Sequence, residues 1–171
     1  MSIVFSIYIL FQSPGYFEKR GAAKKLLTVR TVFCYTSGMK KVPGGNELLN
    51  AERLLQDVGL GPRQIVADLG CGSAGYFVLQ AARLVGEKGL VYAVDILKSA
   101  LQSVESRAKV QGFSNIQTIW SNLEVYRATQ IPDKTLDHAL LINTLFQSKK
   151  HEEIVRESHR MLKSGGKLTV V

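Results

Sequence analysis

The sequence contains few cysteines and no apolar run long enough to cross a membrane. Its two cysteines are too few for a disulfide framework or a cysteine-based metal cluster, and this usage is typical of a reducing compartment such as the cytoplasm. The apolar run at residues 3–11 is too short to span a bilayer, and no basic residues precede it as they would in a signal peptide. We therefore expect no metal site and no stable membrane insertion.

Acidic residues are outnumbered by basic ones, which gives the chain a formal net charge of +8. Such a surplus favours a nucleic-acid partner when it lies in the functional domain. Here residues 1–41 carry seven basic side chains and one acidic side chain, whereas the rest of the chain carries 15 and 13. The domain itself is therefore nearly neutral, and net charge gives little support to an RNA partner.

The chain divides into a basic N-terminal extension, residues 1–41, and a domain, residues 42–171. Residues 16–37 have no steady hydrophobic period, and Met39 opens a stretch that joins the domain smoothly. Three interpretations of the extension are open: a partly ordered or disordered segment that covers the ligand site, a weak anchor at a membrane surface, or residues upstream of the natural start. We favour the third, in which residues 1–38 do not belong to the natural protein.

Within the domain, short apolar strands alternate with helical patterns. The apolar runs predict strands at about residues 64–69, 90–95, 116–120, 138–143 and 167–171. The spacing of apolar residues and the capping residues Asn46 and Ser148 predict helices at about residues 46–58, 76–85, 97–112 and 148–162. This alternation is typical of an α/β fold with a doubly wound parallel sheet and helices on both faces. Ligands of such sheets bind beyond the carboxyl ends of the strands.

The most informative segment is a glycine-rich turn that follows the first of these strands. The strand leads into Asp68, and Gly70, Gly72 and Gly75 then allow the backbone to approach a ligand closely. The next strand ends in a second acid, Asp95, about 20 residues further on. This combination is typical of a nucleoside site, in which the carboxylate accepts hydrogen bonds from both ribose hydroxyls. A second interpretation makes Asp95 the N-cap of the helix that follows.

These motifs resemble those of the class I S-adenosylmethionine-dependent methyltransferases. The acid-x-Gly-x-Gly motif of that family corresponds to residues 68–72, and its ribose-binding acid corresponds to Asp95. Its Leu-Lys-Pro-Gly-Gly-like turn corresponds to residues 162–166, which read Leu-Lys-Ser-Gly-Gly. The resemblance covers roughly residues 44–171 and implies a Rossmann-like sheet of strand order 3-2-1-4-5.

One departure from the family leaves a second ligand class open. The family usually places its third glycine at the position of Ala74, whereas this chain has Gly75. The resulting Gly-x-Gly-x-x-Gly pattern also fits an NAD(P)-dependent oxidoreductase. Asp68 favours S-adenosylmethionine, because its carboxylate would face the pyrophosphate of a dinucleotide but tolerates a cationic ammonium and sulfonium.

The resemblance implies roles for the residues around the glycine turn. Gly70, Cys71, Gly72 and Gly75 are expected to lie against the methionyl end of the cofactor. Asp68 is expected to orient that end through its ammonium or a water, although bonding to the N–H groups of the turn is an equal alternative. A catalytic thiol at Cys71 is not favoured, because the turn needs a small residue at this position.

The resemblance also implies an adenine site and a position near the acceptor. Ile96 is expected to cover the adenine face, Asn122 to accept from the adenine amino group, and the Leu123 N–H to meet a ring nitrogen. Asn143 ends the fourth predicted strand near the methyl group, although a bond within its own loop is a second interpretation. Trp120 is expected in the core. No general base can be named, so the catalytic residues remain unknown.

We interpret the chain as a methyltransferase that uses S-adenosylmethionine and favours a small-molecule acceptor, with RNA or protein as further candidates. The sheet of the family usually continues with two more strands, and the sequence ends at Val171 before them. The last strand is therefore expected to form an open edge, and a non-catalytic S-adenosylmethionine-binding remnant is an alternative. The sequence does not indicate an oligomeric state.

Overall fold

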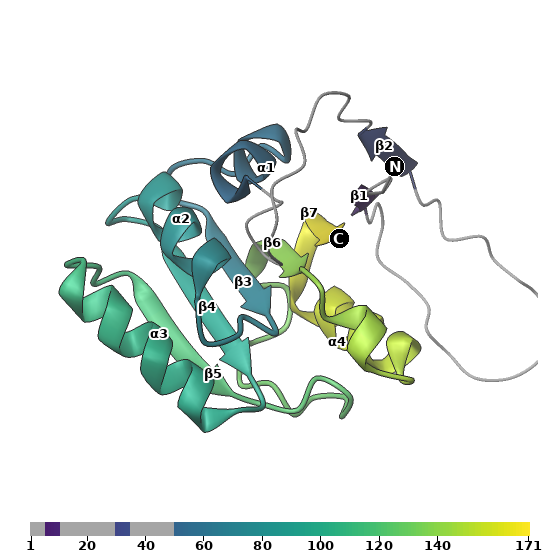
Figure 1. Ribbon diagram of the computed structural model, residues 1–171. Coiled ribbons are helices and arrows are strands. Elements are labelled where there is room, and N and C mark those ends of the chain that lie inside the picture. Colours follow the sequence, from purple (N-terminus) through teal and green to yellow (C-terminus); the bar gives the residue numbers. More distant parts are fainter. Residues whose placement is uncertain (1–5, 11–29, 35–49) are drawn as a thin grey trace, which may run out of the picture.

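The computed structural model describes residues 6–10, 30–34 and 50–171 (Figure 1). Its helices are α1 (Ala51–Asp57), α2 (Tyr76–Val85), α3 (Lys98–Val110) and α4 (His151–Met161), with a short 3-10 helix, η2 (Leu145–Gln147). Its strands are β1 (Ser6–Leu10), β2 (Arg30–Cys34), β3 (Ile65–Leu69), β4 (Leu90–Asp95), β5 (Ile116–Trp120), β6 (Leu136–Leu141) and β7 (Leu162–Val170).

Five parallel strands form the body of the sheet in the order β5-β4-β3-β6-β7. In chain order this is 3-2-1-4-5, which confirms the predicted topology. The chain leaves β3 in one direction and β6 in the other, so the carboxyl ends of these two neighbours border the point where the strand order reverses (Figure 1). Open α/β sheets bind their ligands at such a point.

The expected open edge at β7 is wrong. β1 pairs antiparallel with β7, with Ile7 opposite Val170 and Leu10 opposite Lys167, and β2 pairs antiparallel with β1. The apolar run near the start of the chain thus supplies a strand that satisfies backbone groups which β7 would otherwise leave unpaired. Most of residues 1–41 lie outside the described residues, so the interpretation of this extension stays a prediction.

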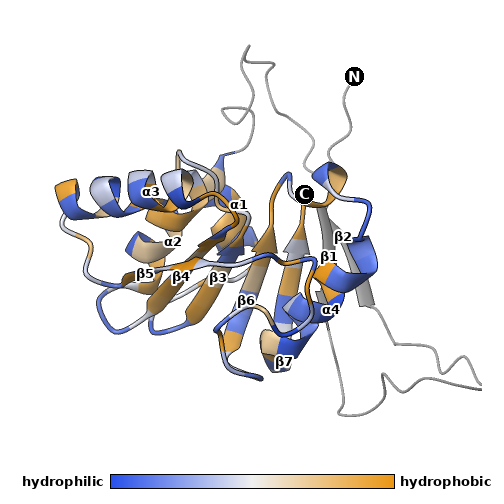
Figure 2. Ribbon diagram, turned by 90° about the horizontal axis from the view of Figure 1, so that it is seen from below, coloured by the Kyte–Doolittle hydropathy of each residue, from blue (hydrophilic) through white to orange (hydrophobic). Residues whose placement is uncertain are grey.

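Two apolar clusters cover the two faces of the sheet. Alternate residues of β3 divide between them, because Val66 joins the cluster beneath α1, α2 and α3, whereas Ala67 and Leu69 join the cluster beneath α4. Figure 2 shows the hydrophobic strands between helices whose outer surfaces are hydrophilic. The predicted placement of helices on both faces is confirmed.

Several element boundaries differ from the prediction. The first described helix begins at Ala51 and is capped by Asn50, whose side chain accepts from the Arg53 N–H at 2.9 Å, while Asn46 lies outside the described residues. The helix expected after Ser148 begins at His151. The fourth predicted strand lies two residues earlier, so Asn143 follows β6 rather than ending it.

A buried ion pair joins α4 to the loop between β5 and β6. Glu157 is fully buried and accepts from the backbone N–H groups of Arg127 at 2.8 Å and Thr129 at 3.2 Å. The Arg160 guanidinium contacts the Glu157 carboxylate at 2.7 Å and that of Asp133 at 2.6 Å. The pair therefore fixes the loop that follows β5 against α4, and neither charge is left alone in the interior.

Replacing Arg160 by leucine should destabilise the fold strongly, because the Glu157 carboxylate would stay buried without its counterion. We expect Arg160→Leu to lower the free energy of unfolding by about 3 kcal/mol or more. Urea denaturation measures this change. Arg53→Leu is the matched control, because its 4.0 Å ion pair with Asp57 is exposed and should contribute less than about 1 kcal/mol. Equal effects of the two substitutions would contradict the interpretation.

Candidate functional site

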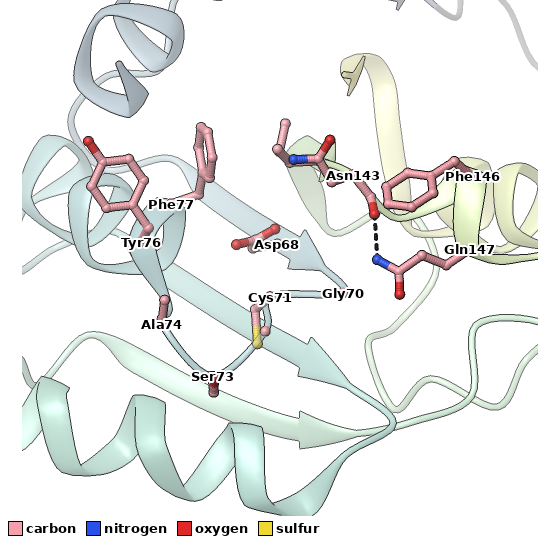
Figure 3. A pocket seen from close by; sticks show the side chains of 12 residues that line it. Asp68, Gly70, Cys71, Ser73, Ala74, Tyr76, Phe77, Asn143, Phe146 and Gln147 are labelled. Atoms are coloured by element: carbon pink, nitrogen blue, oxygen red, sulfur yellow. Dashed lines mark hydrogen bonds between the residues drawn. The ribbon is translucent and has the colours of Figure 1, made fainter. Parts of the chain in front are cut away.

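A cavity of about 500 Å³ opens at the carboxyl ends of β3 and β6 (Figure 3). Its walls come from the glycine turn, the first turn of α2 and the segment that follows β6. The lining residues are Asp68, Gly70, Cys71, Gly72, Ser73, Ala74, Tyr76, Phe77, Ile142, Asn143, Phe146 and Gln147. None of these twelve carries a basic side chain, so the cavity is suited to a neutral or cationic ligand.

The structure requires glycine at the three positions of the turn for different reasons. Each has a positive φ, but a Cβ on Gly70 would lie 2.5 Å from the Thr144 hydroxyl, and a Cβ on Gly75 would lie 2.8 Å from a Val104 methyl. A Cβ on Gly72 would meet no atom within 4 Å. Gly70 and Gly75 therefore allow the turn to pack against the protein, whereas Gly72 presents its backbone to open space where a ligand can lie.

Asp68 is buried and has no hydrogen-bond donor within residues 50–171. It is 3% exposed, and its side chain borders the cavity (Figure 3). The N–H groups of the turn bond elsewhere, since Gly70 and Cys71 donate to the Val94 carbonyl and Gly72 donates to Asp95. The alternative in which Asp68 bonds to its own turn is therefore wrong. Burial, together with the charge of Asp95, raises the pKa of Asp68 to about 7.

Asp95 is held by two backbone donors. One carboxylate oxygen accepts from the Gly72 N–H at 2.9 Å and the other from the Leu97 N–H at 2.8 Å. Each oxygen keeps acceptor capacity for a further donor, such as a ribose hydroxyl. The N-cap position of α3 is Leu97, without a side-chain cap bond, so the interpretation of Asp95 as the N-cap is wrong.

The structure brings only part of the predicted site together at the cavity. Asp68, Gly70, Cys71, Gly72 and Asn143 line it, and Asp95 is attached through its bond to Gly72. The remaining predicted residues, Gly75, Ile96, Asn122 and Leu123, are not among the lining residues. The cavity thus covers the predicted methionyl end of the site, and the predicted nucleoside end lies outside it.

The amide residues of the predicted site already serve their own loops. The Asn122 side-chain oxygen accepts from the Glu124 N–H at 2.9 Å, which leaves it reduced capacity for a ligand. Asn143 has a φ of 54°, and its carbonyl accepts from the Gln147 side chain at 2.7 Å (Figure 3). This bond is made by the Asn143 backbone, and its side chain has no hydrogen bond within residues 50–171, so the predicted loop bond of the asparagine side chain is not found; the residue lines the cavity.

The sequence analysis missed the aromatic residues at the cavity. Phe146, on η2, is 75% exposed, and Tyr76 is 40% exposed and packs edge-on against Phe77. Tyr76 was assigned only to a helix, and residues 145–147 follow a predicted strand without a recognised pattern. Thr144 was also missed, although its hydroxyl ties this segment to the glycine turn by donating to the Leu69 carbonyl at 2.8 Å.

The Cys71 thiol is suited to filling space rather than to nucleophilic attack. Burial, followed by the charges of Asp68 and Asp95, raises the pKa of this thiol far above its usual value. Among the described residues, no three His, Cys, Asp or Glu side chains are grouped as metal ligands.

The raised pKa of Asp68 gives a stability prediction with a definite sign. A carboxyl whose pKa is higher in the folded state adds stability below about pH 4, and this contribution is lost as the pH rises through about 7. Raising the pKa of this carboxyl from 3.8 to about 7 corresponds to ~4 kcal/mol. Asp68→Asn removes this titration. The free energy of unfolding of the variant minus that of the unliganded wild type should therefore increase by ~4 kcal/mol between about pH 4 and pH 8.

Urea denaturation at several pH values measures this difference, and comparing two proteins cancels the titration of the other carboxyls. Asp57→Asn is the matched control, because that side chain lies on the surface of α1. If the difference in free energy of unfolding between Asp68→Asn and wild type does not change with pH, burial does not destabilise the charged form of Asp68 in the unliganded protein.

Comparisons with known proteins agree with this geometry. A family model described as a methyltransferase domain matches residues 62–171. A demethylmenaquinone methyltransferase of Geobacillus sp. is 30% identical over 101 residues, which are 59% of this chain and 42% of that protein. The ubiquinone/menaquinone biosynthesis C-methyltransferase UbiE of Citrobacter koseri is 33% identical over 109 residues, 63% of this chain and 42% of that protein. The chain thus spans less than half the length of these relatives.

Solved structures share the fold. A SAM-dependent methyltransferase from Aquifex aeolicus has 26% sequence identity and a TM-score of 0.63, over 71% of this chain and 63% of that one. The arsenic(III) S-adenosylmethionine methyltransferase CrArsM from Chlamydomonas reinhardtii has 29% identity and a TM-score of 0.59, over 64% of this chain and 38% of that one. With the family model, the strand order and the glycine turn, these findings place the chain in the methyltransferase domain family, whose fold implies S-adenosylmethionine as the cofactor.

Proposed function

We propose that this chain binds S-adenosylmethionine and forms part of an enzyme that methylates a small molecule. The observation that carries the proposal is the buried Asp68 carboxylate, which borders the cavity and has no donor within residues 50–171. A buried carboxylate without a partner is costly, and a cationic ligand group relieves that cost. The ammonium of the methionine moiety is such a group.

The residues at the cavity suit the methionine end of the cofactor, and the residues proposed for its nucleoside end lie outside the cavity. Asp68 and the open backbone of Gly72 would hold the methionine end, and the two Asp95 oxygens would accept from the ribose hydroxyls. Ile96 would lie along the adenine, with Asn122 and Leu123 at its edge. A dinucleotide fits less well, because its pyrophosphate would face Asp68 and none of the twelve lining residues has a basic side chain to offset its charge.

When bound, S-adenosylmethionine supplies a methyl group that its sulfonium already activates. The protein then has to align the acceptor and exclude water rather than provide strong acid or base. The lining residues agree with this requirement. Asp68 would face the ammonium, the Cys71 thiol stays protonated, and the described lining residues include no histidine or lysine.

The acceptor is proposed to be small and largely apolar. Exposed aromatic side chains, Phe146 and Tyr76, lie at the cavity, and the residues that line it carry one acidic and no basic side chain. The names of the two relatives above, which refer to demethylmenaquinone and ubiquinone, support an acceptor with a planar quinone-like ring. An RNA acceptor is less favoured, since the lining offers no cation for a phosphate.

We also propose that the enzyme acts in the cytoplasm, on the basis of its sparse cysteines. The described part of the chain has no helix that is both long and apolar enough to span a membrane.

Calorimetric titration tests the cofactor. We expect the protein to bind S-adenosylmethionine and S-adenosylhomocysteine but not NAD(H), and Asp95→Ala to weaken binding by about 2 kcal/mol through the lost ribose hydrogen bonds. Asp57→Ala, on the surface of α1, is the matched control and should bind as the wild type does. Binding of NAD(H) in place of both sulfur compounds would refute the proposal. Transfer of labelled methyl to a reduced demethylated quinone then tests the acceptor.

Gly72→Ala separates binding from folding. The new methyl group meets no protein atom, so its stability cost is the strain of a positive φ, about 1–2 kcal/mol. It would occupy the space assigned to the cofactor, so we expect affinity to fall by at least ten-fold. Thermal unfolding and the same titration measure the two effects. Gly112→Ala, also at a positive φ with no atom within 4 Å of the new methyl group, is the control and should show the strain without the loss of affinity.

A further inference from the structure

Trp120, the single tryptophan of the chain, lies at the carboxyl end of β5, directly opposite Asp95 of β4. The prediction that it belongs to the core is wrong, because its side chain is 56% exposed. An exposed indole beside the acid assigned to the ribose calls for an explanation that the core does not provide.

The Trp120 indole holds the turn between β4 and α3. Its Nε1–H donates to the Ile96 carbonyl at 2.7 Å. From the other side of the same turn, Asp95 accepts from the Leu97 N–H at 2.8 Å. The side chains of Ile96 and Leu97 are 53% and 61% exposed, so packing contributes little to the position of the turn. The Leu97 carbonyl also accepts from the Ala100 and Leu101 N–H groups, so Leu97 is held by α3 as well, whereas the bond from the indole is the one that holds Ile96.

The first turn of α3 also contacts the indole. The Lys98 ammonium lies 5.2 Å from the centre of the Trp120 ring, within the range of a cation–π contact. The ring is thus bound at its N–H by the turn and at its face by the helix. A surface tryptophan restrained at two points is a suitable support for a short turn.

We propose that Trp120 is a positioning residue for the adenine end of the cofactor, which it orients by fixing Ile96. The inference rests on the proposed function, in which Asp95 holds the ribose. Adenine is attached to that ribose, so the residue after Asp95 lies beside the base, and the exposed Ile96 side chain offers it an apolar surface. Trp120 acts on the cofactor only through Ile96.

The experiment compares the affinity for S-adenosylhomocysteine in four proteins: wild type, Trp120→Phe, Ile96→Ala and the double variant. Trp120→Phe keeps a ring beside Lys98 but removes the donor, and it should weaken binding about five-fold. In the Ile96→Ala background the same change should have no further effect on affinity, because the side chain that Trp120 positions is gone, although the backbone carbonyl that accepts from the indole remains. Tyr92→Phe, which removes a hydroxyl from the middle of β4, is the matched control and should not change the affinity.

An isosteric replacement removes the donor alone. The chain has one tryptophan, so β-(3-benzothienyl)alanine supplied in place of tryptophan during expression is incorporated only at position 120. This analogue has sulfur in place of the indole N–H, and the labelled protein should bind as weakly as Trp120→Phe does. It also serves as the test if Trp120→Phe does not fold. A merely structural role would lower the thermal stability without this dependence on Ile96.

The outcomes separate the two proposals. If wild type binds no S-adenosylhomocysteine, the proposed function fails. If wild type binds and the sulfur isostere binds equally well, the positioning role alone is overturned. Independent, additive losses in the double variant would also overturn it, because they indicate direct contact of the indole with the cofactor.

Discussion

The interaction on which this site depends is the meeting of two buried carboxylates, Asp68 and Asp95, at the ends of neighbouring parallel strands. Both lie near the carboxyl ends of apolar strands, and both side chains are buried. The protein satisfies one of them, since Asp95 receives two backbone donors, and provides none for the other within residues 50–171. Asp95 therefore shapes the glycine turn, whereas Asp68 is the acid that the proposed function assigns to a cationic ligand group.

Local sequence patterns were sufficient to predict the sheet but not the contacts that complete it. Continuous apolar runs and glycine stops define strands and turns over a few residues, and the strand order followed from the family resemblance. The covering of β7 by β1, by contrast, joins residues more than 150 positions apart. The N-cap of α1 is Asn50 rather than the predicted Asn46, because the two asparagines are equally good caps on local criteria.

The candidate site was predicted best where its chemistry is local. Asp68, Gly70 and Gly72 belong to one turn, and the cavity gathers them as expected. The sequence could not show that Gly70 is required by Thr144 and only Gly72 faces open space, because that difference depends on a segment about 75 residues away. The role of Trp120 was hidden in the same way, since an apolar residue in a strand is indistinguishable from core until its neighbours are known.

In the proposed function, the two ends of the site would recognise the ligand by different physical means. At the cavity, charge would decide, because a buried carboxylate without a donor within residues 50–171 favours a cation. At the nucleoside end, shape would decide, because the exposed side chains of Ile96 and Leu97 offer an apolar surface. The position of that surface depends on hydrogen bonds rather than on packing. The twelve lining residues include no strong base, so the proposed acceptor is one whose nucleophilic atom is electron-rich or already ionised when it arrives. Within the proposed function, the lack of basic side chains among these twelve residues therefore favours the cationic cofactor and also narrows the acceptors that it could methylate.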